Sequence, residues 1–283
     1  MEPIGSALTA GVAFAVLGAA LLHAAWNALI KSGREPLLDT ALIALGGTLV
    51  ALPLLPLVRP PDPAAWPYLA ASVAVHLAYY TALAGAYKAG DLSHGYPIMR
   101  GTAPLLVAAA SVFWFHEALS PAAWAGVLLI CGGVLSLGMA GGGASRGVTG
   151  WALLNALVIA LYTLADGTGV RLAGGAGGYV VWLFLFQGLP FGLAVLAMRR
   201  GEFLGHAARH WPRGLAGAVL SGLSYGIALW AMTRAPVSVV AALRETSVIF
   251  ASLIGAWFLG EGHLKARVAG AVIVFAGLVA LRF

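Results

Sequence analysis

Ten apolar runs of membrane-spanning length make up most of the chain, and this feature limits the possible folds more than any other. The runs cover residues 7–30, 37–57, 66–87, 92–115, 121–139, 148–166, 178–198, 211–233, 236–259 and 264–282. A helix needs about 20 apolar residues to cross the hydrocarbon core of a bilayer, so each run is long enough for one span. The pattern predicts an all-α integral membrane protein with ten transmembrane helices and connections too short for a soluble domain.

The composition agrees with a membrane protein and excludes an ordinary soluble domain. Of the 283 residues, 61% are hydrophobic and only 9% are charged, whereas a soluble domain has about 25% charged residues. The net charge is +6, but the basic residues are scattered through short connections, so we expect the lipid bilayer as a partner and no nucleic acid. The first apolar run has no basic residue before it and exceeds a signal-peptide core, so we expect it to be retained.

An internal repeat appears when the chain is aligned with itself at an offset of 144 residues. At this offset Arg100 aligns with Arg244 and Glu117 with Glu261, and biased composition supplies such charged pairs less easily than pairs of Ala or Gly. Each copy holds five spans, an odd number, so the second copy enters the membrane from the opposite side. We therefore predict two inverted five-helix repeats, residues 1–140 and 148–283, joined by a Gly-rich linker at 141–147. Inverted repeats are the recurrent architecture of secondary transporters.

Two arginines inside apolar runs are the strongest candidates for a substrate site. Arg100 and Arg244 each lie eight residues after the predicted start of a helix, which is a depth of about 12 Å. Measured from opposite faces of a core about 30 Å thick, these depths meet near the midplane. A guanidinium there costs at least about 2.5 kcal/mol unless it faces the interior and has a partner. Glu245 neutralises one arginine, and we expect a substrate anion to neutralise the other. The alternatives are that the arginine side chains extend to a membrane interface, or that they make structural ion pairs with Glu245 and Asp166.

Further polar and aromatic side chains extend this candidate site. His23, Trp26 and Asn27 share one face of the first predicted helix, either as substrate contacts or as hydrogen-bonding partners between helices. The aromatic candidates for lining the site are Tyr80, Tyr225 and Trp230, together with Tyr79, Tyr96 and Tyr162.

Three acidic residues outside the substrate site have simpler interpretations. Asp166 lies near the predicted end of the sixth helix, where we expect it to be solvated. Glu117 and Glu261 follow the fourth and ninth helices, and we expect them to act at helix termini.

Two paired motifs resemble a known family of transporters. Phe115-His116-Glu117 and Leu259-Gly260-Glu261 each precede the Gly-containing last helix of a repeat. Together with the five-plus-five duplication, they resemble the drug/metabolite transporter superfamily in its ten-span EamA-like branch. The segments Leu22–Asn27 and Leu243–Ser247 resemble one bacterial subgroup. The resemblance implies secondary transport of small metabolites across the cytoplasmic (inner) membrane, often as export, through a central cavity.

These observations together predict a secondary active transporter that works by alternating access. We expect it to export a small anionic or zwitterionic metabolite, such as an amino acid or an organic acid, with protons as the coupling ion and Glu245 as the expected proton carrier. The alternatives are an exporter of hydrophobic cations or drugs, which the arginines disfavour, and a non-transporting subunit of a membrane assembly.

An enzyme is not expected from this sequence. Its single cysteine, Cys131, and its dispersed histidines form no metal-ligand set, and no nucleophile and base converge. No P-loop is present, which disfavours an ATP-driven pump. We therefore expect no catalytic residue, no metal and no cofactor.

The orientation in the membrane receives two opposing predictions. Ten Lys and Arg lie in the connections after odd-numbered spans, and four lie after even-numbered spans. The positive-inside rule places the side with ten in the cytoplasm, so both termini lie outside the cell. The family resemblance instead implies that both termini are inside, and the sequence leaves the oligomeric state open.

Overall fold

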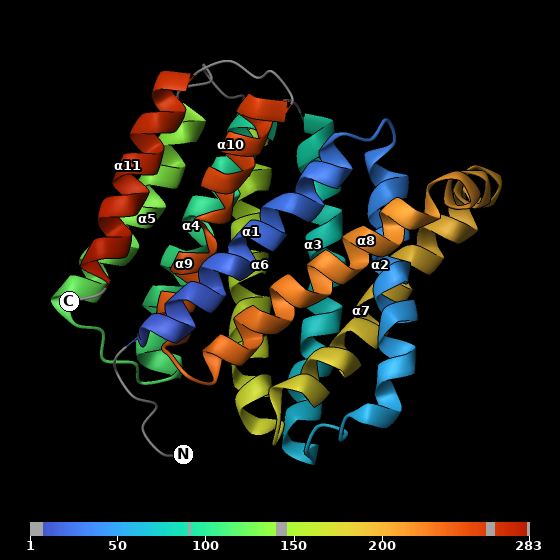
Figure 1. Cartoon of the computed structure of the whole chain (residues 1–283), viewed down its shortest axis with the longest axis horizontal. Coiled ribbons are helices and arrows are strands. Elements are labelled where there is room, and N and C mark those ends of the chain that lie inside the picture. The colour runs from blue at the N-terminus through green and yellow to red at the C-terminus, as the bar shows by residue number, and fades with distance from the viewer. Residues whose placement is uncertain (1–7, 90–91, 140–145, 259–263, 282–283) are drawn as a thin grey trace.

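The computed structural model describes residues 8–89, 92–139, 146–258 and 264–281, and all regular structure in these ranges is helical. The helices lie side by side in one bundle (Figure 1). In chain order they are α1 Ala10–Lys31, α2 Pro36–Ala51, η1 Leu52–Leu57, η2 Pro63–Ala65, α3 Trp66–Ala89, α4 Leu92–Trp114, α5 Pro121–Met139, α6 Arg146–Leu172, α7 Ala176–Met198, α8 Arg200–Met232, α9 Val237–Arg244, α10 Ser247–Phe258 and α11 Leu264–Ala280, where η marks a 3₁₀ helix.

Six of the described helices are long and apolar enough to cross a membrane. They span Ala10–Ile30, Pro36–Leu57, Gly95–Trp114, Arg146–Leu172, Ala176–Met198 and Arg200–Met232. Large apolar side chains such as Phe14, Phe113 and Phe275 are at least 66% exposed on the outer surface of the bundle. Such side chains are favourable in lipid and costly in water, so the bundle is that of a multi-pass membrane protein.

Three helices differ from the predicted runs in ways that affect the site. Helix α6 continues to Leu172 instead of ending near residue 166. Helix α8 begins at Arg200, so the segment between the predicted seventh and eighth runs is the first part of a 33-residue helix. The ninth run is not one helix, because α9 ends at Arg244 and α10 begins at Ser247.

Close glycine contacts between α5 and α11 show how the two repeats meet. A Cβ atom on Gly126 would lie 2.9 Å from the carbonyl oxygen of Gly277, and a Cβ on Gly277 would lie 2.8 Å from that of Gly126. Gly133 and Gly270 show the same reciprocity, at 3.0 and 3.2 Å. At the 144-residue offset, Gly126 is equivalent to Gly270 and Gly133 to Gly277. Residue numbers therefore rise along one helix while they fall along the other, so these equivalent helices are antiparallel, as an inverted repeat requires.

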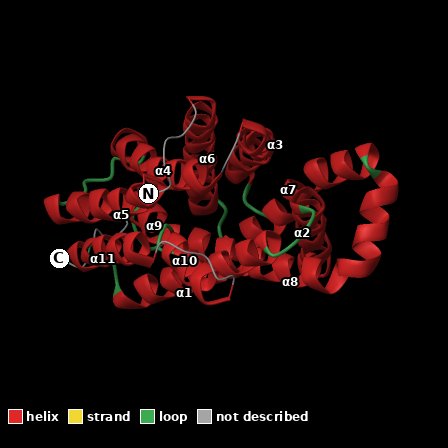
Figure 2. Ribbon diagram, turned by 90° about the horizontal axis from the view of Figure 1, so that it is seen from above, coloured by secondary structure: helices red, strands yellow, loops and turns green. Residues whose placement is uncertain are grey.

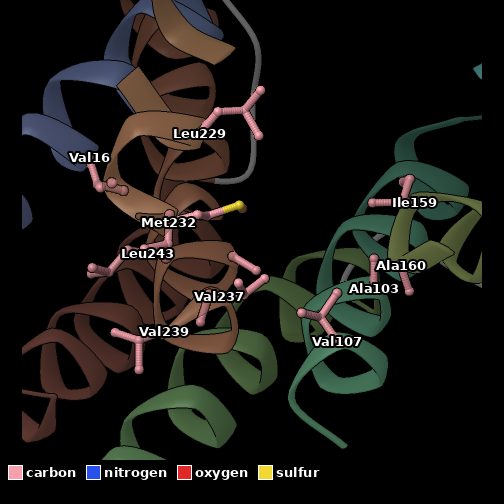
Figure 3. Packing of buried hydrophobic residues seen from close by; sticks show 14 of the residues in the cluster. Val16, Ala103, Val107, Ile159, Ala160, Leu229, Met232, Val237, Val239 and Leu243 are labelled. Atoms are coloured by element: carbon pink, nitrogen blue, oxygen red, sulfur yellow. The ribbon is translucent and has the colours of Figure 1, made fainter. Parts of the chain in front are cut away.

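The remaining helices of the two repeats interlock across the bundle. Helix α3 packs on α6, and its equivalent α8 packs on α1, while α2 packs on α7. Figure 2 shows α5 and α11 at one end of the bundle and α2 and α7 at the other. The hydrophobic core draws on both repeats: Val107 of α4 and Ile159 of α6 belong to the same buried cluster as Met232 of α8 and Leu243 of α9 (Figure 3).

Candidate substrate site

Arg100 and Glu245 form a buried ion pair that joins the two repeats. Arg100 Nε lies 2.8 Å from Glu245 Oε2, and the two side chains are only 7% and 5% exposed. Arg100 also donates from Nη2 to Ser247 Oγ at 3.3 Å. Helix α4 supplies the arginine, and the junction of α9 and α10 supplies both acceptors. Arg100 is therefore buried and paired with Glu245, an ion pair that the structural alternative in the sequence analysis also contains.

The helix break beside Arg244 has a clear hydrogen-bonding basis. Glu245 N–H donates to the Ala242 carbonyl at 3.0 Å and Thr246 N–H to that of Leu243 at 3.1 Å, which are 3₁₀-type bonds. Val248 N–H then donates to the Glu245 carbonyl at 3.0 Å, not to that of Arg244. In membrane proteins, irregular backbone of this kind is tolerated where it is buried in protein or lines a cavity.

Helix α4 has a comparable irregularity at the equivalent depth. Pro104 lies inside α4 and has no N–H to donate to the carbonyl of Arg100. Both arginines therefore lie where a helix loses a regular hydrogen bond.

Arg244 lies over an aromatic ring and pairs with no acidic residue that the structure describes. Its Cζ atom is 4.9 Å from the centre of the Tyr225 ring, and the residue is 8% exposed. A cation over an aromatic face gains up to about 2 kcal/mol when it is desolvated. This is less than a full counter-ion provides, so Arg244 can still bind an anion.

Both arginines line one small cavity between the repeats. Its walls are Arg100, Ala103, Pro104, Val107, Ile159, Tyr162, Thr163, Ala241, Arg244 and Glu245, and its volume is about 10 Å³. A volume of this size holds about one water molecule. The conformation is therefore closed around the arginines, and a metabolite requires the helices to move apart.

Asp166 is fully buried, which corrects the prediction that it is solvated. It is 0% exposed, and it accepts hydrogen bonds from Tyr179 Oη at 2.8 Å and from Tyr225 Oη. The prediction was wrong because α6 continues six residues beyond Asp166, so the carboxylate lies within the bundle. Tyr225 therefore links the two charged groups: its hydroxyl donates to Asp166 and its ring faces Arg244.

A group of aromatic rings surrounds this carboxylate. The His76 ring stacks on Tyr162 at 4.2 Å between centroids, and Tyr162 meets Tyr225 edge to face at 6.4 Å. His76 Nδ1 lies 2.8 Å from the carbonyl oxygen of Ser72. Because a carbonyl only accepts, this nitrogen carries a proton. His76, Tyr162 and Tyr179 thus join the site from α3, α6 and α7.

The first-helix candidates lie beside the arginines and not among the cavity-lining residues. His23 lies within range of the charges of Arg100 and Arg244 and meets Trp26 edge to face at 5.1 Å. Trp26 Nε1 is buried and has no acceptor among the described residues. Asn27 Nδ2 donates to the His23 carbonyl of its own helix at 2.8 Å, so it joins no neighbouring helix there.

One aromatic candidate stands apart from this group. Trp230 lies under the guanidinium of Arg234, 5.5 Å from the ring centre, near the end of α8. The side chain of Tyr80 lies outside the described residues, although its backbone belongs to α3.

One end of the bundle is closed by a network around Glu117. Its Oε1 accepts from Val237 N–H and its Oε2 from Ser238 Oγ, each at 2.7 Å, so it caps the start of α9. Arg171 Nη2 lies 3.3 Å from Glu117 Oε1, and Arg171 Nε donates to the Met232 carbonyl at 2.8 Å. The prediction that Glu117 acts at a helix terminus is confirmed, whereas Glu261 lies outside the described residues.

The Phe115-His116-Glu117 motif shows how the chain turns this carboxylate toward α9. His116 has a left-handed φ of 52°, and Glu117 N–H returns to the Ser111 carbonyl at 3.2 Å. Glycine is the residue that most often takes this left-handed conformation after the end of a helix. The equivalent position in the second repeat is Gly260 in the sequence.

The other end of the bundle is closed between α2 and the first part of α8. His206 Nε2 lies 2.9 Å from Asp39 Oδ1, with the side chains 9% and 4% exposed. Arg213 donates to Ser32 Oγ at 2.9 Å and joins the α1–α2 connection to α8. We call the Glu117–Arg171 network and the Asp39–His206 contact the two polar closures.

Comparison with known proteins agrees with the architecture. The model of the EamA-like transporter family matches residues 10–139 and again residues 148–283. One solved structure, described only as the crystal structure of a protein, superimposes with a TM-score of 0.74 and 18% identity over 95% of this chain and 94% of that chain. At this identity the likeness shows the fold alone. No curated protein matches the sequence. Since the family model matches nearly the whole chain as two copies, this multi-pass membrane protein belongs to the EamA-like transporter family of the drug/metabolite transporter superfamily.

Proposed function

We propose that the chain is a secondary active transporter for a small anionic or zwitterionic metabolite, such as an amino acid or an organic acid. In this proposal ten spans form two inverted repeats, residues 1–140 and 148–283, joined by residues 141–147. In this proposal the transporter resides in the cytoplasmic (inner) membrane, exports its substrate and is coupled to protons.

One observation carries the proposal: Arg100 and Arg244, at equivalent positions of the two repeats, line the same buried cavity. A buried guanidinium is costly in a membrane unless it is paired. Glu245 lies against Arg100 at 2.8 Å, while among the described residues Arg244 meets the face of Tyr225 at 4.9 Å and no acidic side chain. A carboxylate, sulfonate or phosphonate that enters the cavity would supply the missing acceptor with the geometry that arginine favours.

The two polar closures support transport by alternating access. Glu117 and Arg171 join α4, α6 and α9 at one end, and Asp39 and His206 join α2 and α8 at the other. The closures use different residues, so one can open while the other stays shut. Pore-like leakage would require both to open at once.

Counterflow in proteoliposomes tests the proposal directly. Purified protein is reconstituted into proteoliposomes that are loaded with unlabelled amino acids, organic acids or hydrophobic cations. Uptake of the matching labelled compound is then followed. We expect counterflow with one class of anion or zwitterion and its loss in Arg244→Gln. Counterflow restricted to hydrophobic cations would refute the proposal and favour a drug exporter. Absence of counterflow with every class, in protein that elutes as a folded species, would favour an assembly subunit.

A further inference from the structure

With both carboxylates ionised, the four buried charged side chains that the structure describes at the site balance, and this balance limits what an anion can do on entering. Arg100 and Arg244 provide two positive charges, and Glu245 and Asp166 provide two negative charges, with every one of these residues at most 8% exposed. An entering monoanion leaves one negative charge in excess. An uncompensated charge in a low-dielectric interior costs several kcal/mol, so the least costly way to admit a monoanion is to admit a proton with it.

The two carboxylates differ in how easily they accept that proton. Glu245 lies against Arg100 at 2.8 Å, so protonating Glu245 would leave the Arg100 guanidinium without its counter-ion. Among the described residues, the hydrogen-bond donors to Asp166 are neutral hydroxyl groups, from Tyr179 at 2.8 Å, from Tyr225 and from Ser72. Protonating Asp166 therefore breaks no ion pair. A tyrosine hydroxyl can also accept a hydrogen bond, so the neutral acid keeps a partner.

The groups around Asp166 leave it as the carboxyl group best placed for this role. Helix α3 contributes His76, α7 contributes Tyr179 and α8 contributes Tyr225, with Arg244 of α9 behind the Tyr225 ring. Helix α4 contributes Arg100, which is paired with Glu245. The His76 ring stacks on Tyr162 and holds a proton on Nδ1 toward the Ser72 carbonyl.

Tyr225 contacts both Asp166 and Arg244, so a change at the carboxyl group can affect the arginine directly. Its hydroxyl donates to Asp166 while its ring lies 4.9 Å below the Arg244 guanidinium. When Asp166 gains a proton, its attraction for the hydroxyl hydrogen of Tyr225 weakens, because a neutral acid is a poorer acceptor than a carboxylate. The ring is then free to move, and Arg244 can leave it and turn toward the anion.

We propose that Asp166, and not Glu245, takes up the proton that accompanies an anion into the arginine site. The proton comes from the aqueous phase, binds an Asp166 carboxylate oxygen and returns to water when the site reopens. The proposal rests on the proposed transport function, but the protonation itself can be measured without any substrate.

Infrared difference spectroscopy of the full chain in lipid nanodiscs, recorded while the pH is lowered, tests this assignment. We expect the C=O band of a buried carboxylic acid to appear in the wild type. It should be lost in Asp166→Asn and retained in Glu245→Gln. Thermal unfolding and elution volume establish that each variant is folded. Loss of the band in Glu245→Gln with retention in Asp166→Asn would overturn the proposal, and so would the absence of any such band throughout the pH range of the folded wild type.

Milder variants keep the test decisive if Asp166→Asn does not fold. Tyr179→Phe and Tyr225→Phe each remove one donor to the carboxylate, so the band should appear at higher pH by about one unit. Tyr68→Phe, outside this network, should leave the spectrum unchanged. A band that is unmoved by both network variants would overturn the assignment. If counterflow fails with every metabolite while the band behaves as expected, the transport proposal fails and the protonation of Asp166 stands.

Discussion

Arg100 Nε lies 2.8 Å from Glu245 Oε2, so the middle of α4 in the first repeat is held against the break between α9 and α10 in the second. Arg244, the residue before this glutamate, lies instead over Tyr225 at 4.9 Å. Glu245, the acidic residue at the break, is therefore the counter-ion of Arg100. This asymmetry between two equivalent positions is the physical basis for the anion-binding site that we propose.

Replacement of the arginines should weaken substrate binding in proportion to the geometry that is lost. Arg244→Gln should lower affinity about tenfold or more, because a charge-assisted hydrogen bond is lost. Arg100→Lys should also weaken binding, since lysine keeps the charge but not the planar two-pronged contact. Affinity is measured on purified, folded variants, with Arg171→Gln as a control that alters an end closure. Normal affinity in both Arg100→Gln and Arg244→Gln would place the site elsewhere.

Loss of the buried ion pair should destabilise the protein strongly. Glu245→Gln leaves Arg100 without a counter-ion, and breaking a buried pair in this way costs about 3–5 kcal/mol. Thermal unfolding in detergent should show a clear decrease in midpoint. The matched control is Glu202→Gln, which removes the exposed pair with Arg199 and should not shift the midpoint. Equal midpoints for the two variants would mean that the Arg100–Glu245 pair contributes little.

Two adjacent glycines of α5 should respond oppositely to alanine. A Cβ on Gly133 would lie 2.7 Å from a Val274 side-chain atom and 3.0 Å from the Gly270 carbonyl oxygen, whereas a Cβ on Gly132 meets nothing within 4 Å. Gly133→Ala must push α5 from α11, at a cost of about 1–3 kcal/mol. Gly132→Ala should be neutral or slightly stabilising, because alanine favours the helix. The measurement is the thermal unfolding midpoint of each variant. A larger decrease for Gly132→Ala than for Gly133→Ala would contradict the prediction.

A single cysteine can decide the orientation that the charge count and the family resemblance leave in conflict. The only native cysteine, Cys131, is buried, and Gly205 is exposed in the first part of α8. On the charge count, Gly205→Cys lies on the cytoplasmic side and should resist a membrane-impermeant thiol reagent added to intact cells. Labelling from outside, together with an inaccessible N-terminus, would refute this orientation and support the family-based one.

The sequence by itself determined the features that depend on local apolar pattern and on duplication. Runs of apolar residues marked most helices within a few residues, because membrane helices satisfy their own backbone hydrogen bonds. The offset between Arg100 and Arg244 revealed the repeat and predicted that the two arginines converge, because inversion turns equal depths from opposite faces into one level. Their shared cavity agrees with this reasoning.

Only the tertiary structure decided which partners these charges meet. No local signal distinguishes a continuous ninth helix from one that breaks after Arg244, because Glu245 and Thr246 are compatible with either. Asp166 carried a usable signal, since the uncharged residues 167–170 follow it before Arg171 and an ionisable residue inside a span is rarely solvated. Its acceptance of hydrogen bonds from Tyr179 and Tyr225 could not be predicted, because a carboxylate can be satisfied by any nearby donor. Which donor is near depends on how α6, α7 and α8 pack, and that packing is set by contacts distributed over the whole bundle.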